Sequence, residues 1–216
     1  MNAREKLFKY LQNQEPEKFI NTYYYCENVY KDDNNELLNE LLILATAYNN
    51  TKILSFLLSK DVDKNIKNAS GCTPIMNMAK LGNIDVFKKL FFDSSVCLTN
   101  ISNTGENLLI CASQCMHHNL EILKLIISKN LFNIYDTDNN GRNILIHSLN
   151  NLDRLTYLIT DLDYVLDDKT IKELQKNTKN PFSNSSIALD IYNKKQLSEQ
   201  LNISLNKKER KNYFKV

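Results

Sequence analysis

The residues with the clearest capacity for chemistry are two cysteines and two histidines in the segment CASQCMHH, residues 111–118. Cys111 and Cys115 are four positions apart, so on a helix they would share one face. His117 and His118 follow where that helix is expected to end. Sulfur and imidazole nitrogen are ligands that zinc accepts in tetrahedral sites. The segment therefore raises the hypothesis of a metal site.

Three observations favour an ordinary structural role for the same segment. Its spacing matches no standard zinc pattern. Cys111 takes a position that is largely apolar in neighbouring segments, and a buried cysteine packs as a small hydrophobic residue. Histidines near a helix C-terminus interact favourably with the helix dipole. We therefore expect no metal and no other cofactor, and we keep an enzyme that uses these four side chains as a minor alternative.

The rest of the sequence offers no catalytic motif. It has no GxSxG, no HExxH and no P-loop, and four glycines are too few for a glycine-rich phosphate loop. His147 has no carboxylate or nucleophile at a motif spacing, so we interpret it as a packing or hydrogen-bonding residue. The sequence thus predicts a protein that is not an enzyme.

The elements that must position these side chains are marked by three recurring glycines. Gly71, Gly105 and Gly141 are 34 and 36 residues apart, and each opens a similar stretch: GCTPIMNMAK, GENLLICAS and GRNILIHSL. Self-similarity at such a period is typical of stacked repeats, in which one supersecondary unit recurs.

The clearest unit, residues 71–104, reads as a pair of helices. Thr73 is a suitable N-cap and Pro74 suits the first helical position. Gly82 can end this helix in the left-handed conformation. A second helix over 84–92 then places its apolar residues on one face.

The neighbouring units have different residues at the capping and helix-ending positions, but these residues can play the same structural roles. Asn107 and Asn143 stand where Thr73 stands, and asparagine caps equally well. Asn49 and Asn50 lie near the position of Gly82 and suit a left-handed residue. The apolar face of the second helix returns in Ile122, Leu123, Ile126 and Ile127.

A period of about 33 residues with a core similar to T-P-L-H-x-A resembles the ankyrin repeat. The resemblance is clearest at 71–104 and weaker at 37–70, 105–140 and 141–160. It implies an all-α solenoid of stacked helix-turn-helix units with short β-hairpin-like fingers, such as the one expected at 133–141. About four to six repeats are expected when the terminal caps are included.

We expect residues 1–216 to form a single ankyrin-repeat domain. A divergent N-terminal repeat or cap occupies 3–36, with two helices of which Pro16 begins the second. Core repeats follow at 37–160, and a degenerate C-terminal repeat at 161–204 holds one helix within 187–201 and a short second helix. A basic tail is expected at 205–216.

Composition gives information on the class of partner and on the cellular compartment. The net charge is +2 and the basic residues form no stripe outside the tail, which disfavours nucleic acid. Five cysteines without regular spacing indicate free thiols in a reducing compartment. The charged N-terminus is unlike a secretory signal, and no run of 18 apolar residues predicts a membrane span. We expect a cytoplasmic monomer, or a protein delivered into a host cell.

The resemblance also implies a binding surface, because partners of ankyrin proteins usually contact the concave face. When the repeats are aligned with one another, the concave face falls on the fingers and on exposed positions of the first helices. These positions hold one lysine, one glutamate, one arginine and many amides. Such a surface suits a protein partner that is recognised by hydrogen bonds and shape. The predicted residues are Tyr48, Ala69, Ser70, Cys72, Lys80, Leu81, Asn103, Thr104, Glu106, Gln114, Asn139, Asn140, Arg142, Asn150 and Asn151, with Cys115 beside them.

Two functions remain open at this point. The first is an interaction module, such as a microbial or viral effector or adaptor; the second is an immunity protein or inhibitor that blocks a cognate toxin enzyme. Tyr23, Tyr24 and Tyr25 are a further feature, because three consecutive helical residues cannot all face one core. At least one of them should be exposed, either as an interface tyrosine or as part of a partly buried cap helix whose hydroxyls reach water.

Overall fold

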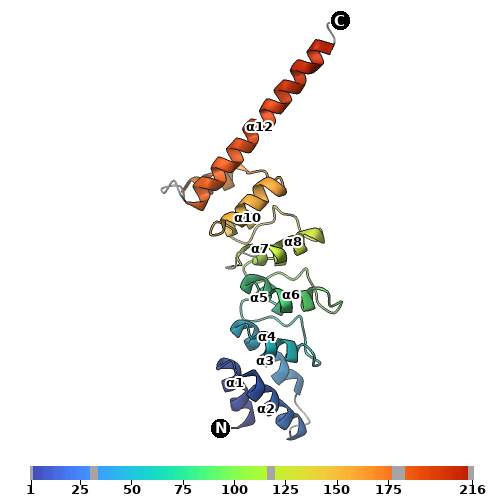
Figure 1. The fold of residues 1–216 in the computed structure, drawn as a ribbon. Helices are drawn as coiled ribbons and strands as arrows, with labels where there is room; N and C mark the ends of the chain where they lie inside the picture. Colours follow the sequence, from blue (N-terminus) through green and yellow to red (C-terminus); the bar gives the residue numbers. More distant parts are fainter. Residues whose placement is uncertain (1, 30–33, 116–119, 177–182, 214–216) are drawn as a thin grey trace. The chain divides into compact units, whose positions relative to one another are not determined.

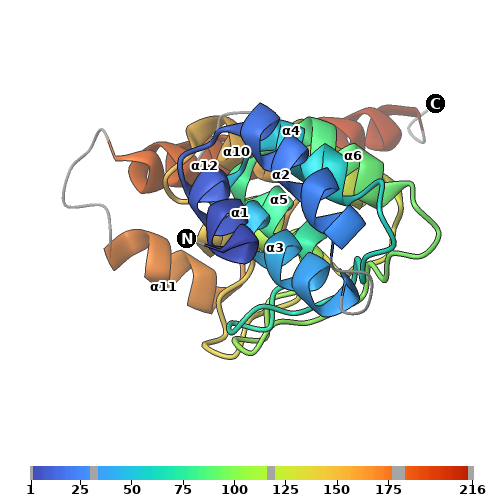
Figure 2. The same ribbon diagram turned by 90° about the horizontal axis from the view of Figure 1, so that it is seen from below.

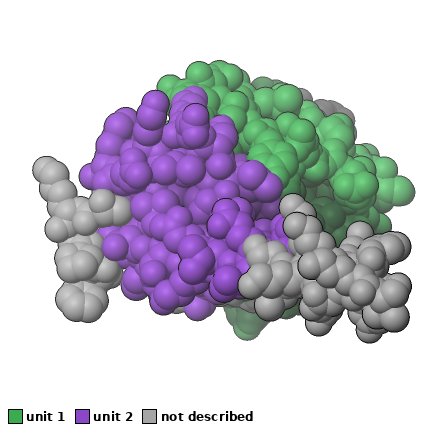
Figure 3. Space-filling model, turned by 90° about the horizontal axis from the view of Figure 1, so that it is seen from above, with its two compact units in different colours: residues 1–144 green, residues 145–216 purple. Residues whose placement is uncertain are grey.

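The computed structural model describes residues 2–29, 34–115, 120–176 and 183–213. Their contacts divide the chain into two compact units, residues 1–144 and 145–216, which Figure 3 distinguishes by colour. Each unit is described by itself. The single domain expected over 1–216, with its internal bounds, stays a prediction.

The first unit is a series of helix pairs, and Pro16 begins the second helix as the sequence predicts. In chain order the pairs are α1 (Ala3–Gln12) with α2 (Pro16–Val29), α3 (Asn34–Tyr48) with α4 (Thr51–Leu57), α5 (Pro74–Leu81) with α6 (Ile84–Phe91), and α7 (Leu108–Ser113) with α8 (Glu121–Ser128).

These pairs stack in two layers. The first helices contact one another in the order α1, α3, α5, α7, and the second helices in the order α2, α4, α6, α8 (Figure 1). Figure 2 looks along the stack and shows α1, α3 and α5 on one side, with α2, α4 and α6 beside them. The predicted apolar face of α6, formed by Val86, Phe87, Leu90 and Phe91, is buried between the layers. The fold is therefore the all-α stack of helix pairs that the repeat pattern predicts.

The helix ends confirm most of the predicted caps. Pro74 begins α5, and Gly82 ends it in the left-handed conformation with φ of 70°. Asn49 takes the same role after α3 with φ of 52°. The side chain of Asn107 accepts a hydrogen bond from the Ile110 amide over 2.9 Å, which caps α7.

The expected cap at Thr73 is wrong in its chemistry. Thr73 does occupy the N-cap position of α5, but its hydroxyl makes no capping hydrogen bond. The oxygen is buried and has no hydrogen-bond partner among the described residues. Proline and glycine thus define the ends of this helix without help from the threonine side chain.

The second unit has a different construction. It contains the end of α9 (Ile144–His147), α10 (Leu152–Thr156), a π-helical turn η1 (Tyr157–Asp161), α11 (Asp168–Lys176) and α12 (Asn184–Tyr213). Helices α10 and α11 and the turn η1 all pack against α12. The expected short helix followed by a second one is wrong, because α12 is continuous over 30 residues. The segment from 184 to 213 lacks glycine and proline, the two residues most unfavourable inside a helix.

Candidate functional site

Three tight turns precede first helices and form the fingers of the first unit. In each turn the first amide donates to the carbonyl four residues later, over 3.0 Å: Asn68 to Cys72, Ser102 to Glu106 and Asp138 to Arg142. In each turn the glycine amide also donates to the carbonyl three residues earlier. Among the described residues, β pairing is limited to one isolated bridge, Thr137 with Asn143. The fingers are therefore turns, and the hairpin-like pairing expected of them is reduced to that single bridge.

A side-chain oxygen organises each finger from within. Asn68 Oδ1 accepts from the amides of Ser70 and Cys72 over 2.9 and 3.0 Å. Ser102 Oγ does the same for residues 104 and 106, and Asp138 Oδ1 for residues 140 and 142. The sequence interpretation missed these three residues. Their signal was present, since Asn, Ser or Asp three positions before Gly is the preferred composition of a type I turn.

Neighbouring fingers are joined by an asparagine ladder. The Asn103 amide donates to Ser70 O over 3.0 Å, and its side-chain Nδ2 donates to Ala69 O over 3.1 Å. Asn139 repeats both bonds toward Thr104 O and Asn103 O, over 3.0 and 3.2 Å. The ladder holds three successive fingers in one register.

The ladder also explains two of the glycines. Gly71 and Gly105 have φ of 75° and 80°, which side chains rarely adopt. A Cβ atom at either position would lie 2.7–2.8 Å from the backbone nitrogen of Asn103 or Asn139. Both the conformation and the close approach of the next finger therefore require glycine.

Four of the predicted partner-binding residues come together in one polar cluster, at the ends of two fingers and of the first helices that follow them. Lys80 Nζ lies 2.6 Å from Glu106 Oε2, and Gln114 Nε2 donates to Glu106 Oε1 over 2.5 Å. Lys80 Nζ also lies 3.6 Å from Cys72 Sγ. The cluster joins the finger that precedes α5 to the helix α7 of the next pair.

Electrostatics within this cluster favour the charged forms. The pKa of Cys72 falls from 9.0 to about 6, because the Cys111 thiol can donate a hydrogen bond to the thiolate and the Lys80 ammonium lies nearby. Cys111 keeps its proton, and the same hydrogen bond together with burial raises its pKa. Burial acts to raise the pKa of Glu106, but hydrogen bonds from Lys80 and Gln114 lower it below its ordinary value.

Comparison with known proteins gives the family of this architecture. A family model described as ankyrin repeats, in three copies, matches residues 41–130. Residues 41–130 carry ankyrin repeats. The matched segment runs from within α3 to just beyond α8 and includes the fingers at 68–72 and 102–106. No curated protein matches the chain. Ankyrin repeats are modules of protein–protein interaction, and the family is typically non-catalytic.

The predicted partner-binding residues differ in their accessibility. Tyr48, Lys80, Leu81 and Gln114 are half-buried, whereas Cys72, Glu106 and Asn151 are buried, as is Cys115. The exposed members are Ala69, Ser70, Asn103, Thr104, Asn139, Asn140, Arg142 and Asn150. Asn150 and Asn151 belong to the second unit, where the Asn151 side chain caps α10 by accepting from the Arg154 amide over 2.9 Å.

Arg142 has a structural partner of its own. Its guanidinium lies 2.7 Å from Asp138 Oδ2, and its Nε donates to the same oxygen over 2.8 Å. The Asp138 side chain is fully buried within its finger. A charge reversal at Arg142 would therefore place two carboxylates together and disturb the finger itself, so it is a poor probe of partner binding.

The structure describes the two cysteines of the proposed cysteine and histidine cluster but not its two histidines. Cys111 and Cys115 are buried free thiols, and His117 and His118 lie outside the described residues. Among the residues that are described, no group of three or more His, Cys, Asp or Glu side chains could hold a metal ion.

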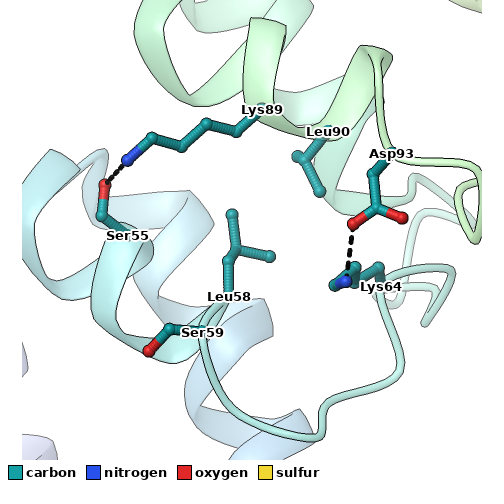
Figure 4. A pocket seen from close by; sticks show the side chains of 7 residues that line it. All are labelled: Ser55, Leu58, Ser59, Lys64, Lys89, Leu90 and Asp93. Atoms are coloured by element: carbon teal, nitrogen blue, oxygen red, sulfur yellow. Dashed lines mark hydrogen bonds and ion pairs between the residues drawn. The ribbon is translucent and has the colours of Figure 1, made fainter.

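A small pocket lies in the layer of second helices, between the end of α4 and α6 (Figure 4). Its volume is about 270 Å³, at the lower limit for ligand sites. Lys64 Nζ is 2.6 Å from Asp93 Oδ2, and Lys89 Nζ donates to Ser55 Oγ over 2.8 Å. Both lysines are therefore engaged in joining neighbouring repeats. No helix within the described segments is both long enough and apolar enough to cross a membrane.

Proposed function

We propose that this protein binds a partner protein through its finger surface, the exposed residues of the three fingers and the adjoining ends of the first helices. The asparagine ladder carries the proposal. It holds the exposed pairs Ala69–Ser70, Asn103–Thr104 and Asn139–Asn140 in a fixed row. A row that is ordered before binding loses little conformational entropy when the partner docks.

The charge of this surface favours a protein over a nucleic acid. The six paired residues of the row are uncharged. Lys80 is paired with Glu106, and Arg142 with Asp138. Phosphate backbones are bound by lysine and arginine side chains that neutralise them, and the row provides no such side chain. Amides, hydroxyls and shape complementarity would carry recognition instead.

We propose two candidate classes of partner protein. The first candidate is a host or cellular protein, bound by an effector or adaptor. The second is a toxin enzyme, which an immunity protein or inhibitor of this kind would block. In both cases the protein acts as a cytoplasmic monomer, and the identity of the partner distinguishes the two.

The test is affinity capture from lysates of the source organism and of a host, with mass spectrometry of the captured proteins. Ser70→Arg and Asn140→Arg each add bulk and charge to the row without removing a side-chain hydrogen bond of the ladder. Ser94→Arg is the matched control, because Ser94 is equally exposed but lies in the loop after α6.

We expect one protein to be captured by the wild type and by Ser94→Arg, and to be lost with both finger variants. Capture that survives both finger variants would place the interface elsewhere. A captured host protein supports the effector role, and a captured enzyme whose activity is blocked supports the inhibitor role.

A further inference from the structure

Three aromatic rings surround one lysine in the first unit. Tyr23 and Tyr24 of α2 and Phe56 of α4 have ring centroids 5.2–5.9 Å apart, and each pair of rings is inclined by 75–77°. The Nζ atom of Lys60 lies 4.9 Å from the Tyr23 centroid, 4.8 Å from that of Tyr24 and 5.2 Å from that of Phe56. Three nearly perpendicular rings therefore form an aromatic cage around a cation.

The cage is accessible from the surface. Tyr23 is 2% exposed and forms its floor, whereas Tyr24 is 47% exposed at its rim. Phe56 and Lys60 are half-buried. Lys60 follows the C-terminal end of α4 in a turn, outside both helices, and its ammonium stands on a flexible four-carbon stem.

A second lysine makes a more distant cation–π contact and serves as a comparison. Lys129, which follows α8, lies 5.9 Å from the ring centroids of Phe91 and Phe92. It has two rings at the outer limit of a cation–π contact, whereas Lys60 has three at about 5 Å. The closer, three-sided arrangement at Lys60 has the form of a binding site.

The chemistry of the cage favours a methylated ammonium group over a primary one. Each ring presents its negative face to the cation. A primary ammonium loses hydrogen bonds to water when it enters such a site, because aromatic faces replace them poorly. A trimethylammonium group has no N–H bonds to satisfy, and its polarised methyl groups can contact all three rings.

We propose that Tyr23, Tyr24 and Phe56 form a binding site for a trimethylated lysine side chain of a partner protein, and that Lys60 is a resident cation which this side chain displaces. Helices α2 and α4 belong to the layer of second helices (Figure 2). The cage is therefore separate from the finger surface, and the inference does not depend on the function proposed for that surface.

The experiment is an NMR titration of the full chain with Nα-acetyl-trimethyllysine methylamide, following aromatic signals. The unmethylated lysine analogue and a neutral analogue with a tert-butyl group in place of trimethylammonium serve as ligand controls. Choline distinguishes the lysine side chain from other carriers of the same group. Lys60→Ala, Tyr24→Ala and Tyr24→Phe are the cage variants, and Tyr25→Ala is the matched control, since Tyr25 is 66% exposed and next in sequence.

We expect the wild type to bind the trimethyllysine analogue at least tenfold more tightly than either the unmethylated or the neutral analogue. Lys60→Ala should tighten binding about tenfold by removing the competing cation, Tyr24→Ala should weaken it about tenfold, and Tyr24→Phe and Tyr25→Ala should leave it within twofold. Equal binding of the neutral analogue, absence of binding even to Lys60→Ala, or a preference for choline over trimethyllysine would each overturn the proposal.

Discussion

Thr73 shows how one position can be recognised while its chemistry is mistaken. The hydroxyl is buried at the N-cap of α5 and has no hydrogen-bond partner among the described residues. Thr73→Val keeps the shape and removes the unsatisfied oxygen, so we expect stability to be unchanged or to rise by up to about 1 kcal/mol. Denaturation with urea measures the free energy of unfolding.

Asn107→Ala is the comparison, because the Asn107 side chain does cap its helix. That variant should lose about 1 kcal/mol. If Thr73→Val lost as much as Asn107→Ala, the threonine hydroxyl would have a role that the structure does not show.

Cys72 gives the protein a specific dependence on pH. Its pKa is about 6 in the folded protein and 9.0 ordinarily, so between these values the unfolded chain binds a proton that the folded protein has lost. Stability should therefore rise with pH across this window, and the gain should be lost as pH falls through about 6. The raised pKa of Cys111 acts in the opposite sense above the window.

The measurement is urea denaturation from pH 6 to pH 9, comparing the wild type with Cys72→Ala. The variant should lack the rise in unfolding free energy over this window. Cys26→Ala is the control, because burial raises the pKa of Cys26, so its thiol stays protonated in both states below about pH 8 and its loss should leave the slope there unchanged. Parallel curves for the wild type and Cys72→Ala would contradict the charged state of Cys72.

At the scale of elements, two glycines with the same backbone conformation have different neighbours. Gly82 has φ of 70° at the end of α5, and Asn49 holds the equivalent place after α3. Gly105 has φ of 80°, and a Cβ atom there would lie 2.8 Å from the Asn139 nitrogen. We expect Gly82→Asn to cost less than about 1 kcal/mol, and Gly105→Asn to cost about 2 kcal/mol more because the finger must also shift.

Thermal or urea denaturation of both variants decides this prediction. Equal losses would mean that backbone conformation alone selects glycine in the fingers. A larger loss for Gly105→Asn would show that the packing of one finger on the next adds a separate requirement.

Helix α12 shows what local patterns leave open at this scale. The A-L-D motif within 187–201 predicted a short first helix and a partner, as in a terminal repeat. The chain instead continues as one helix to Tyr213. Glycine is the residue that most often ends a helix, and this segment has neither glycine nor proline, so the helix continues through its asparagines.

At the scale of the whole molecule, the repeats are joined by residues that are one period apart. Asn83 donates to the Asn49 side chain, Asn103 to Ala69 O and Lys89 to Ser55 Oγ, each across 34 positions. Each repeat therefore contacts mainly its neighbours, which is the organisation of a solenoid. The two layers offer separate surfaces, with the fingers beside the first helices and the aromatic cage on the second helices.

Residue types and their spacing predicted the repeat and most of the ends of its helices. Glycine spacing, Pro74, Gly82 and the apolar face of α6 act through local backbone geometry and periodicity, and these are readable along the chain. The sequence also predicted that at least one of the three consecutive tyrosines is exposed, and both Tyr24 and Tyr25 are exposed.

Which polar groups contact one another depends on how the repeats pack in three dimensions. Register placed Lys80, Glu106 and Gln114 near one surface, but their mutual bonds, the pairing of Arg142 with Asp138 and the ladder of Asn103 and Asn139 were not predicted. The cage around Lys60 draws its rings from two helices in different repeats. Such contacts depend on how one repeat stacks on the next, because side chains more than 25 residues apart in sequence meet only when the intervening helices have packed.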